Sequence, residues 1–404
     1  MCGNSCILCL QAQSMKTKQN PSLSIVYPHN QRLMSGKAHD IVIMRTCHSV
    51  AKQGPSVKII TGKPSGTESV YDFYGLEPMP EFEIIQVPML RGRHLSWHGI
   101  FNLFCLLKIL DLKKKGQADV IYLREIKLAH FLLKFRKIIG LPFVIEVHDL
   151  KIRKFYDSCP EKDRDEEEVF KKADAIIVLL TSFGNILKDI YDPRAPVIKV
   201  PLAAEKMPLA GVERKNILKK IGYIGQLYPM QGVDLLIEAL RYLPAVGLEI
   251  IGGNERDLYR LKHLASRLNV DNRIEFHGFV NPHRVVEIAK DIDVMVICAL
   301  DKGKRRYSAH TKLYEYMAMG KPIVAFDLPS IREEVTDGMD IILAKPDDPK
   351  SLAEKIGYVL NNPDFARQLA LNAYRSADEF SWEKRAARLS EVFTMVCAKS
   401  RDNE

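Results

Sequence analysis

The sequence lacks any uninterrupted apolar run long enough to cross a lipid bilayer, which argues against a membrane-spanning helix. Its first ten residues, MCGNSCILCL, carry no basic segment ahead of a very short apolar stretch, so a secretory signal peptide is not expected. No G-x-G-x-x-G motif follows a predicted strand, which argues against a nucleotide-dependent dehydrogenase. The eight cysteines are scattered and mostly lie in apolar segments. This pattern is typical of reduced thiols, so we expect a cytoplasmic protein.

Three cysteines stand close together near the N-terminus. The spacing of Cys2, Cys6 and Cys9 is similar to that of the radical-SAM motif, which holds three irons of an iron–sulfur cluster. In that motif the cysteines follow a first strand, whereas here they precede every expected strand and are followed by a polar stretch. We therefore expect no tightly bound cluster, and we interpret residues 1–22 as a disordered tail.

Length and composition indicate a folded protein of more than one domain. The chain has 404 residues, of which 47% are apolar and 27% are charged. A single hydrophobic core rarely grows to that size, so two domains are expected. The formal net charge of +9 is compatible with simple solubility, with phosphate-bearing ligands or with an anionic membrane surface, and does not choose among them. Nucleic-acid binding has only this charge in its favour.

Short β-branched runs alternate with helical patterns along the whole chain. Most of these runs are apolar without alternation, as expected for strands that helices cover on both faces. The expected strands are Leu23–Tyr27, Val57–Thr61, Val120–Leu123, Phe143–Val147, Ala175–Leu180 and Val197–Val200 in the first half, and Ile221–Ile224, Leu248–Ile251, Ile274–Phe276, Val294–Cys298, Pro322–Phe326 and Ile341–Leu343 in the second. The sequence predicts an α/β fold with two doubly wound, Rossmann-like domains, whose ligands bind at the carboxyl ends of the strands in the cleft between them.

The alternation breaks once, in a stretch that mixes proline, glycine and charge around residues 202–218. We expect an N-terminal domain over residues 23–203, a linker over 204–218, a C-terminal domain over 219–376, and a final helix with a short tail over 377–404. The final helix carries an apolar stripe of residues at helical spacing, whose packing partner the pattern does not reveal. The stripe consists of Trp382, Ala386, Leu389, Phe393 and Val396.

The most informative segment, KGKRRYSAHTKLYEYMAMGKP, covers residues 302–322. A basic loop precedes a helix predicted over residues 311–319. Lys312 lies in the first turn, where a cation opposes the helix dipole unless an anion lies in front of it. The exposed N–H groups and Lys312 could hold a phosphate, and Glu315 could accept hydrogen bonds from two vicinal hydroxyls, such as those of a ribose. The alternative is a solvated basic loop with a surface glutamate, and residue types alone leave both open.

Residues 311–324, TKLYEYMAMGKPIV, closely resemble the signature helix of family-4 glycosyltransferases with the GT-B fold. The resemblance implies that backbone N–H groups near Thr311 and Leu313 meet the diphosphate of a nucleotide-sugar donor. It also implies that Lys312 pairs with the diphosphate and that Glu315 binds the ribose.

Further segments of the second half are similar to the donor-binding domain of this family. Gly225 would let the backbone approach the diphosphate. The family usually has basic residues at the positions of Gln226 and Gln231, where an amide would donate without charge assistance. Arg305, Arg306 or Lys312 could compensate for these two glutamines.

Two other positions follow from the same resemblance. The segment EFHGFV implies that backbone atoms of Phe279 and Val280 contact the nucleotide base. A second glutamate of the family, often assigned to the donor sugar, falls at the position of Tyr307 here, so the way in which this chain holds the sugar is open.

In the first half, Ser35, Gly36, Lys37 and His39 lie in the loop after the first strand and at the start of a helix. On residue types alone this is a turn and a cap. The resemblance implies that the loop contacts the acceptor, or the donor phosphate across the cleft.

Glu146-Val147-His148-Asp149 ends a buried strand, where a site is expected, although a lone histidine is more often structural. The family pattern E-x-H-D implies that His148 touches the transferred sugar or the acceptor. Arg124, at the end of the neighbouring strand, would lie beside it.

The resemblance spans residues 23–393 and implies that the final helix crosses back onto the first domain. It implies transfer of a sugar from a UDP-, GDP- or ADP-sugar to a hydroxyl of a glycan or lipid-linked glycan, with retention of anomeric configuration and without a metal or tightly bound cofactor. Two alternatives remain. One is a nucleotide-sugar 2-epimerase on the same fold, and the other is a noncatalytic nucleotide-sugar-binding subunit, which the two glutamines and the tyrosine make credible.

Two predicted helices, Trp97–Leu112 and Ile126–Ile139, combine apolar residues with flanking lysines and arginines. They are either core-packing helices with a basic rim or a peripheral anchor on anionic lipid. In the second case the protein would act at the inner face of a membrane. The oligomeric state does not follow from the sequence.

Overall fold

The computed structural model describes residues 23–34, 38–64, 69–89, 97–151, 162–208, 219–280 and 282–401. The predicted tail with Cys2, Cys6 and Cys9, the loop residues Ser35, Gly36 and Lys37, and most of the predicted linker lie outside these ranges. Among the helices of the described ranges, none is both long and apolar enough to cross a membrane.

The N-terminal half forms a sheet of seven parallel strands in the order β3-β2-β1-β4-β5-β6-β7. The strands are β1 (Ser24–His29), β2 (Ser56–Thr61), β3 (Phe82–Gln86), β4 (Val120–Leu123), β5 (Phe143–Val147), β6 (Ala175–Val178) and β7 (Val197–Lys199). Because β1 pairs with both β2 and β4, the direction of winding reverses between β1 and β4. Such a reversal leaves a crevice at the carboxyl ends of the two strands.

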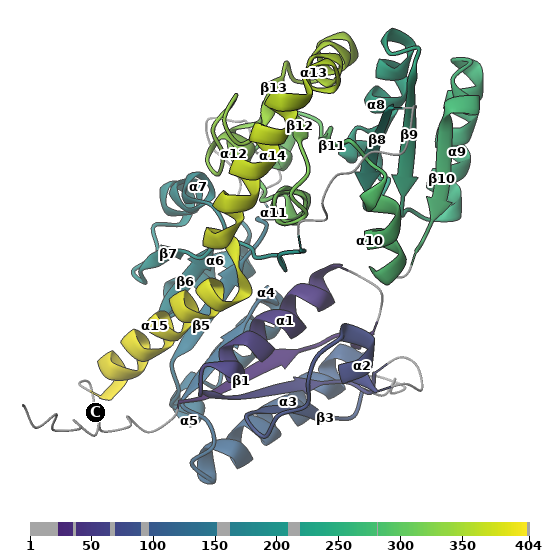
Figure 1. Ribbon diagram of the computed structural model, residues 1–404. Helices are drawn as coiled ribbons and strands as arrows, with labels where there is room; N and C mark the ends of the chain where they lie inside the picture. Colours follow the sequence, from purple (N-terminus) through teal and green to yellow (C-terminus); the bar gives the residue numbers. More distant parts are fainter. Residues whose placement is uncertain are drawn as a thin grey trace, which may run out of the picture.

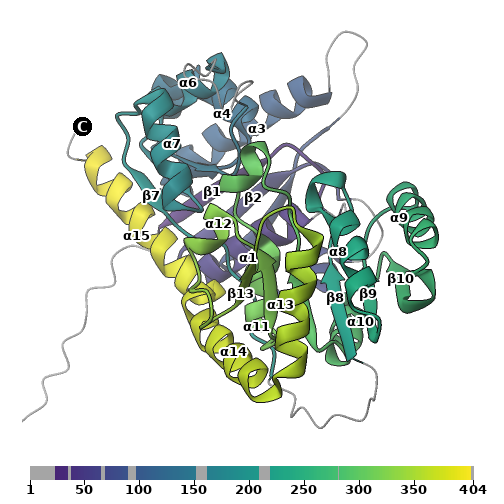
Figure 2. The same ribbon diagram turned by 90° about the horizontal axis from the view of Figure 1, so that it is seen from above.

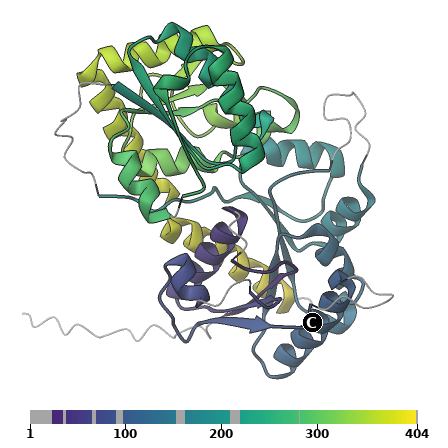
Figure 3. The ribbon, with the colours of Figure 1, turned by 90° about the vertical axis from the view of Figure 1, so that its right-hand side faces the viewer.

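The C-terminal half repeats this arrangement with six parallel strands in the order β10-β9-β8-β11-β12-β13. The strands are β8 (Lys219–Ile224), β9 (Val246–Ile251), β10 (Ile274–Gly278), β11 (Val294–Ile297), β12 (Ile323–Phe326) and β13 (Ile342–Ala344). The reversal of winding lies between β8 and β11, which pair directly. The predicted pair of doubly wound domains is therefore confirmed, and Figure 3 shows one domain above the other.

Helices cover both faces of the first sheet. One face packs against α3 (Trp97–Lys114), α4 (Ile126–Leu133), α5 (Arg136–Ile139), α6 (Arg164–Lys172) and α7 (Thr181–Tyr191). The other face packs against α1 (Ala38–Lys52), the short α2 (Val70–Tyr74) and the final helix α15 (Trp382–Arg401).

The second sheet is also covered on both faces. One core contains residues of α8 (Val233–Ala239), α9 (Glu255–Arg267), α13 (Pro349–Asn361) and α14 (Pro363–Ser376), and the other contains residues of α11 (Thr311–Ala318) and α12 (Pro329–Arg332). The remaining helix, α10 (Pro282–Lys290), follows β10. Single 3₁₀ turns are η1 (Pro229–Gln231), η2 (Leu240–Tyr242), η3 (Asp271–Arg273), η4 (Gly303–Tyr307) and η5 (Ala377–Phe380).

The final helix belongs to the N-terminal domain in space although it follows the C-terminal domain in sequence. Figures 1 and 2 show α14 and α15 leading from the second domain along the first, where α15 packs against α1. Ala386, Leu389 and Phe393 are buried in the core of the first domain, whereas Trp382 lies in the cluster that also contains α11 and α12. The crossing that the family resemblance implies is confirmed.

Polar contacts also hold the two domains together. The carboxylate of Glu333, just after α12, accepts hydrogen bonds from the Ser182 N–H at 3.0 Å and the Ser182 hydroxyl at 2.6 Å, and also from the Thr181 N–H. Lys199 on β7 lies 3.1 Å from Glu333 and 2.7 Å from Glu334. Since the residue that precedes α7 makes no side-chain cap, Glu333 caps this helix of the N-terminal domain from the C-terminal domain.

The structure differs from the sequence-based elements in three places. The edge strand β3 was not predicted, because only one of its five residues is buried and its sequence, FEIIQ, is partly polar. The helix predicted over Ile126–Ile139 is two helices, because Phe135 leaves the helical conformation and Arg136 turns to pair with Asp174 at 2.6 Å. Residues 202–204, which begin the stretch where the alternation breaks and include the first residue of the predicted linker, are buried in the cluster between the domains.

Candidate active site between the two domains

The amino end of α11 lies at the carboxyl end of β11, next to the point where the second sheet reverses its winding. Tyr307 and Ala309, which lead into α11, pack against the core of the first domain, so this helix end lies at the boundary between the domains. The side chain of His310 does not cap the helix and instead lies 3.2 Å from the Ser330 hydroxyl. The first N–H groups of the helix, beginning with Thr311, have no partner within it.

Lys312 extends from the first turn of α11 to the end of β8. Its ammonium Nζ donates to the amide oxygen of Gln231 at 3.3 Å and lies 5.1 Å from the centre of the Tyr223 ring. A Cβ at Gly225, the residue after β8, would lie only 2.7 Å from that nitrogen. Gly225 has a φ of 137°, so both its backbone and the lack of a side chain suit this close approach. Lys312, Gly225 and the tip of α11 therefore meet at one point.

Glu315 follows on the same helix, one turn deeper. Its side chain is exposed to solvent. The protein that surrounds it removes enough water to raise the pKa of the carboxyl above its ordinary value, and Lys312 opposes this shift. Lys312 and Glu315 together offer a cation and a carboxylate at helical spacing, which suits a ligand with a phosphate beside vicinal hydroxyls.

The two glutamines that replace basic residues lie in different environments. Gln231 is engaged in the structure: its amide oxygen accepts from Lys312 and lies 3.5 Å from the Tyr223 hydroxyl. Gln226 is exposed, and its backbone carbonyl accepts from the same hydroxyl at 2.7 Å. Gln226 and Gln231 thus both border the position of Lys312.

The remaining predicted donor residues divide into three groups. The Leu313 side chain is buried and its N–H already donates to the His310 carbonyl at 2.9 Å. Arg306 pairs with Asp301 at 2.8 Å, and the side chain of Arg305 lies outside the described part. Phe279 and Val280 follow β10, at the same edge of the sheet as Gly225, and Phe279 is exposed.

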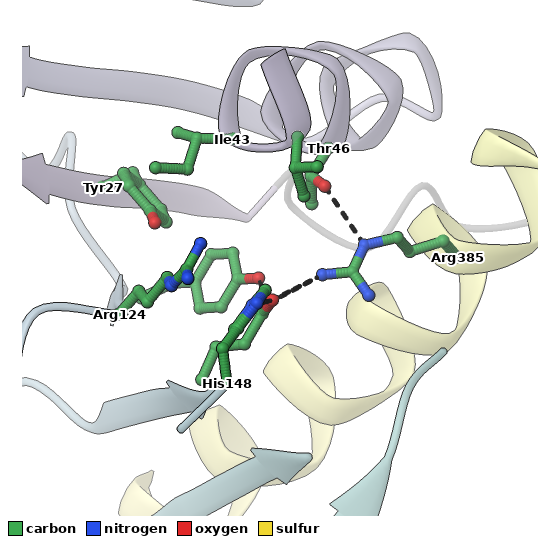
Figure 4. A pocket seen from close by; sticks show the side chains of 9 residues that line it. Tyr27, Ile43, Thr46, Arg124, His148 and Arg385 are labelled. Carbon is green, nitrogen blue, oxygen red and sulfur yellow. Dashed lines mark hydrogen bonds and ion pairs between the residues drawn. The ribbon is translucent and has the colours of Figure 1, made fainter. Parts of the chain in front are cut away.

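On the N-terminal side, His148 follows β5 and is held by a buried carboxylate. Its Nε2 contacts Glu146, and the Tyr122 hydroxyl donates to the same carboxylate. The guanidinium of Arg385, which reaches in from α15, donates to both Glu146 oxygens at 2.7 and 2.8 Å. Figure 4 shows Arg385 extending from the final helix toward Thr46 and toward the side where His148 lies.

Burial and neighbouring charges fix the protonation of this group. Burial alone would raise the pKa of Glu146, but Arg385 and His148 outweigh it and lower the pKa to about 2. Burial and the Arg124 cation lower the pKa of His148 to about 4, although Glu146 opposes them. At neutral pH the site therefore holds an ionised glutamate and a neutral histidine.

Arg124 follows β4 and lines the same pocket as Tyr27 and His148, as Figure 4 shows. The pocket is a cavity of about 10 Å³, which is close to the smallest that holds one water molecule. Burial lowers the pKa of the Arg124 guanidinium. The structure thus brings the predicted pair of His148 and Arg124 together.

His39 opens α1 near the end of β1. Its Nε2 lies 3.0 Å from Asp40 and 3.2 Å from the Gln31 amide oxygen, and the buried ring of His29 lies 3.6 Å from Asp40. One ligand atom from each of His29, His39 and Asp40 lies within 4.8 Å of the others, as is also true of Glu249, Glu275 and His277 in the second domain. These two groups are the described residues that could share a cation.

The sequence analysis did not single out three residues that shape the site, nor Glu333, which joins the two domains. The three residues of the site are Arg385, Tyr122 and Tyr223. For Arg385 a signal was present, because it lies three residues after Trp382 and four before Leu389, on the apolar stripe of the final helix. A charged residue on a buried stripe indicates a buried ion pair.

Comparisons with known proteins concern the fold and the family. Residues 212–376 match the family model described as glycosyl transferases group 1. An uncharacterized glycosyltransferase of Methanocaldococcus jannaschii is 26% identical over 351 residues, which covers 80% of this chain and 83% of that protein.

Two solved structures show the same fold over almost the whole chain. Sucrose-phosphate synthase from Thermosynechococcus elongatus has a TM-score of 0.76 at 17% identity, covering 93% of this chain and 100% of that one. Anabaena HepE in complex with UDP has a TM-score of 0.71 at 15% identity, covering 92% and 100%. The chain therefore has the GT-B fold, and residues 212–376, which include most of its C-terminal domain, are similar to the glycosyl transferases of group 1.

Proposed function

We propose that the protein is a retaining glycosyltransferase that moves a sugar from a nucleoside-diphosphate sugar to a hydroxyl acceptor between its two domains. The observation that carries the proposal is the position of Lys312, whose ammonium lies against Gly225 at the tip of α11. A cation, the amino end of a helix and a glycine that leaves the backbone accessible lie together here, and these three features suit the binding of a diphosphate. Glu315 would accept from the ribose hydroxyls one turn deeper.

The hard step in this reaction is departure of the nucleoside diphosphate as the bond from the sugar to the phosphate oxygen breaks. Negative charge grows on the β-phosphate, where Lys312 and the first N–H groups of α11 would stabilise it. The acceptor hydroxyl attacks the sugar from the same face and forms the new bond, and the departing phosphate takes its proton. Neither the departure of the nucleoside diphosphate nor the attack of the hydroxyl needs a pair of carboxylates or a metal ion.

The acceptor side would be built by the N-terminal domain. His148, neutral and 12% exposed, would hydrogen bond a hydroxyl of the transferred sugar or the acceptor, with Arg124 beside it. We infer that the acceptor is a glycan or a lipid-linked glycan. The loop of Ser35, Gly36 and Lys37, with His39 at its end, would border the acceptor from β1.

A ligand screen on the whole chain tests the donor. We expect UDP, GDP or ADP, and the matching sugar nucleotide, to raise the melting temperature. At 100 times the dissociation constant a ligand adds about 2.7 kcal/mol to the free energy of unfolding. HepE was solved with UDP, so UDP is the first candidate. Transfer to glycan acceptors, followed by NMR of the anomeric proton, then tests retention.

The outcomes separate the alternatives. Inverted product would refute retention, and epimerised free sugar would indicate a 2-epimerase. Nucleotide binding without any product would favour a noncatalytic subunit. A screen in which no nucleoside diphosphate stabilises the protein would refute the donor site itself.

We also propose peripheral contact with an anionic membrane through α3. Leu103, Phe104 and Leu107 on this helix are 52%, 41% and 52% exposed, and Ile138 of α5 is 64% exposed. Lysines near the end of α3 would meet anionic headgroups, and the acceptor would then be lipid-linked. The protein would act in the cytoplasm at the inner face of that membrane.

Co-sedimentation with liposomes tests this contact. We expect Leu103→Asp/Leu107→Asp to reduce binding to vesicles that contain phosphatidylglycerol, and Tyr259→Asp, at an exposed site of the other domain, to leave it unchanged. Binding to vesicles that changes neither with the salt concentration nor with the content of anionic lipid would contradict the proposal.

A further inference from the structure

Arg385 is a fully buried cation on a helix that comes from beyond the C-terminal domain. Its Nε donates to the Thr46 hydroxyl at 3.1 Å, one terminal nitrogen donates to the carbonyls of Val200 and Pro201 at 3.0 and 2.6 Å, and the other donates to both oxygens of Glu146. All three guanidinium nitrogens are therefore engaged, and the group is held in one orientation. A bidentate pair of this kind is among the stronger hydrogen-bonded contacts in proteins.

Glu146 connects this cation to His148. The carboxylate is 3% exposed and receives hydrogen bonds from Arg385 on one side and from the Tyr122 hydroxyl on the other. An ionised carboxylate can only accept, so the Nε2 atom of His148 must carry the proton that it shares with Glu146. In a neutral ring, Nδ1 then carries no proton.

We propose that Arg385 is a positioning residue that acts through Glu146 to hold His148 as the neutral Nε2–H tautomer, so that Nδ1 accepts a hydrogen bond from a substrate hydroxyl. The tautomer follows from the contacts of Glu146 and Arg385. The part that concerns the hydroxyl rests on the proposed sugar transfer. The final helix follows the C-terminal domain in the sequence. Through Arg385 it would nevertheless act on His148, which follows β5 in the N-terminal domain.

The groups around His148 support a neutral ring. Burial, Arg124 just after β4 and Arg385 on α15 all disfavour a second proton, whereas Glu146 on β5 favours it. Tyr27 on β1 and Cys47 on α1 also face this region, and burial raises the pKa of both, so neither adds a charge at neutral pH.

Removing the cation should reverse the balance. In Arg385→Met the buried Glu146 carboxylate keeps His148 as a nearby hydrogen-bonded partner, so the ring should take up a proton at a higher pH than in the wild type. The pKa of His148 should rise by about 1 unit or more, and below this raised pKa Nδ1 should be a donor instead of an acceptor. In the double variant Glu146→Gln/Arg385→Met no anion remains to stabilise an imidazolium, so the ring should stay neutral, as in the wild type.

Long-range ¹H–¹⁵N spectra of the full chain labelled with ¹⁵N-histidine measure both the tautomer and the pKa, with His148→Gln for assignment. No substrate is needed, so the result does not depend on activity. Arg388→Met is the matched control, since Arg388 lies on the same helix in an exposed pair with Glu379 at 3.3 Å and should leave His148 unchanged.

Three results would overturn the proposal. The first is a protonated Nδ1 in the wild type at neutral pH, which needs no variant. The second is a folded Arg385→Met whose His148 pKa equals that of the wild type. The third is an equal shift in the single and double variants, which would show that Arg385 acts only by packing. If the spectra agree and no sugar is transferred, the positioning role stands and the proposed function fails.

Discussion

The two sides of the candidate site are built in opposite ways. On the N-terminal side, an arginine and a glutamate neutralise each other below the surface and present an uncharged histidine. On the C-terminal side, a lysine at a helix tip contacts a glutamine amide and an aromatic ring, and the carboxylate one turn deeper is exposed. On the first side, the protein itself balances the charges of Arg385 and Glu146. The second leaves a positive end at which a ligand with two phosphates would supply the balance.

Removing the charge on the second side should have the largest effect. We expect Lys312→Ala to lower kcat/KM for sugar transfer by about 100-fold to 1,000-fold, because Lys312 would stabilise charge that develops in the transition state. The melting temperature should change little, since the ammonium at a helix amino end does not stabilise the helix. Steady-state kinetics with the identified donor measure the effect.

The matched control is Lys345→Ala, at a side chain that is 76% exposed. It should keep full activity. Unchanged transfer in Lys312→Ala would refute the assignment of the diphosphate to this side.

A methyl group at Gly225 tests the same point without changing any charge. In Gly225→Ala the new Cβ would lie 2.6 Å from Cε and 2.7 Å from Nζ of Lys312, so the ammonium must move. We expect a loss of about 10-fold to 100-fold in kcat/KM, because a shift of about 1 Å in a catalytic group can cost that much.

Backbone strain is controlled by Gly54→Ala. Gly54 also has a positive φ, of 110°, but nothing lies within 4 Å of its added Cβ. Both variants should lose about 1 kcal/mol of stability by thermal melting, and only Gly225→Ala should lose activity. Equal activity in the two variants would show that the position of Lys312 does not matter.

How much of the fold and of this site could be predicted from the sequence depends on whether local patterns or long-range contacts determine each element. Strands such as Val120–Leu123 were predicted to the residue because they are continuous apolar runs, and the position of Lys312 followed from helix stop and start signals. The edge strand β3 was missed because most of its residues are not buried. The turn at Phe135 was missed because the ion pair of Arg136, which accompanies it, cannot be seen in the local pattern.

Long-range partners could not be predicted from local patterns. Arg385 lies 239 residues from Glu146 in the sequence, and the local pattern of neither segment identifies the other as its partner. The family resemblance placed the final helix on the first domain, but only the structure shows that an arginine on it reaches Glu146, on the strand that precedes His148. The same holds for Glu333, whose partners Thr181 and Ser182 belong to the other domain.

The comparison of the two sides requires that the domains are held together, and Glu333 is a candidate for that role. Burial alone would raise its pKa, but hydrogen bonds from Ser182 and Thr181, with Lys199, lower the pKa to about 2. A carboxylate whose pKa is lowered on folding contributes stability above its ordinary pKa, and this contribution is lost as the pH falls toward 2. Glu333→Gln should therefore cost about 1–2 kcal/mol at pH 7 and make stability less dependent on pH below 5, to about the same degree.

Urea unfolding at a series of pH values measures this effect, and the exposed Glu354→Gln serves as the control. A Glu333→Gln curve parallel to the wild type from pH 7 down to pH 3, over which part of the difference should already be lost, would show that the carboxylate does not carry the interaction.

The smallest expected effect comes from restoring a charge that the family usually has. In Gln231→Lys a second ammonium would lie close to Lys312, whose Nζ is 3.3 Å from the present amide oxygen. Two like charges about 4 Å apart repel by about 1 kcal/mol in water and more where protein excludes it, so the free protein should melt at a lower temperature. A bound diphosphate would reverse the sign, because both cations then face an anion, and its affinity should rise by a few-fold. Gln231→Met removes the amide without adding a charge and should weaken binding slightly.

The informative quantity is the difference between the melting temperatures with and without nucleoside diphosphate. If that difference in Gln231→Lys is no larger than in the wild type, the diphosphate does not lie between Gln231 and Lys312, and the positive end of α11 must serve another ligand.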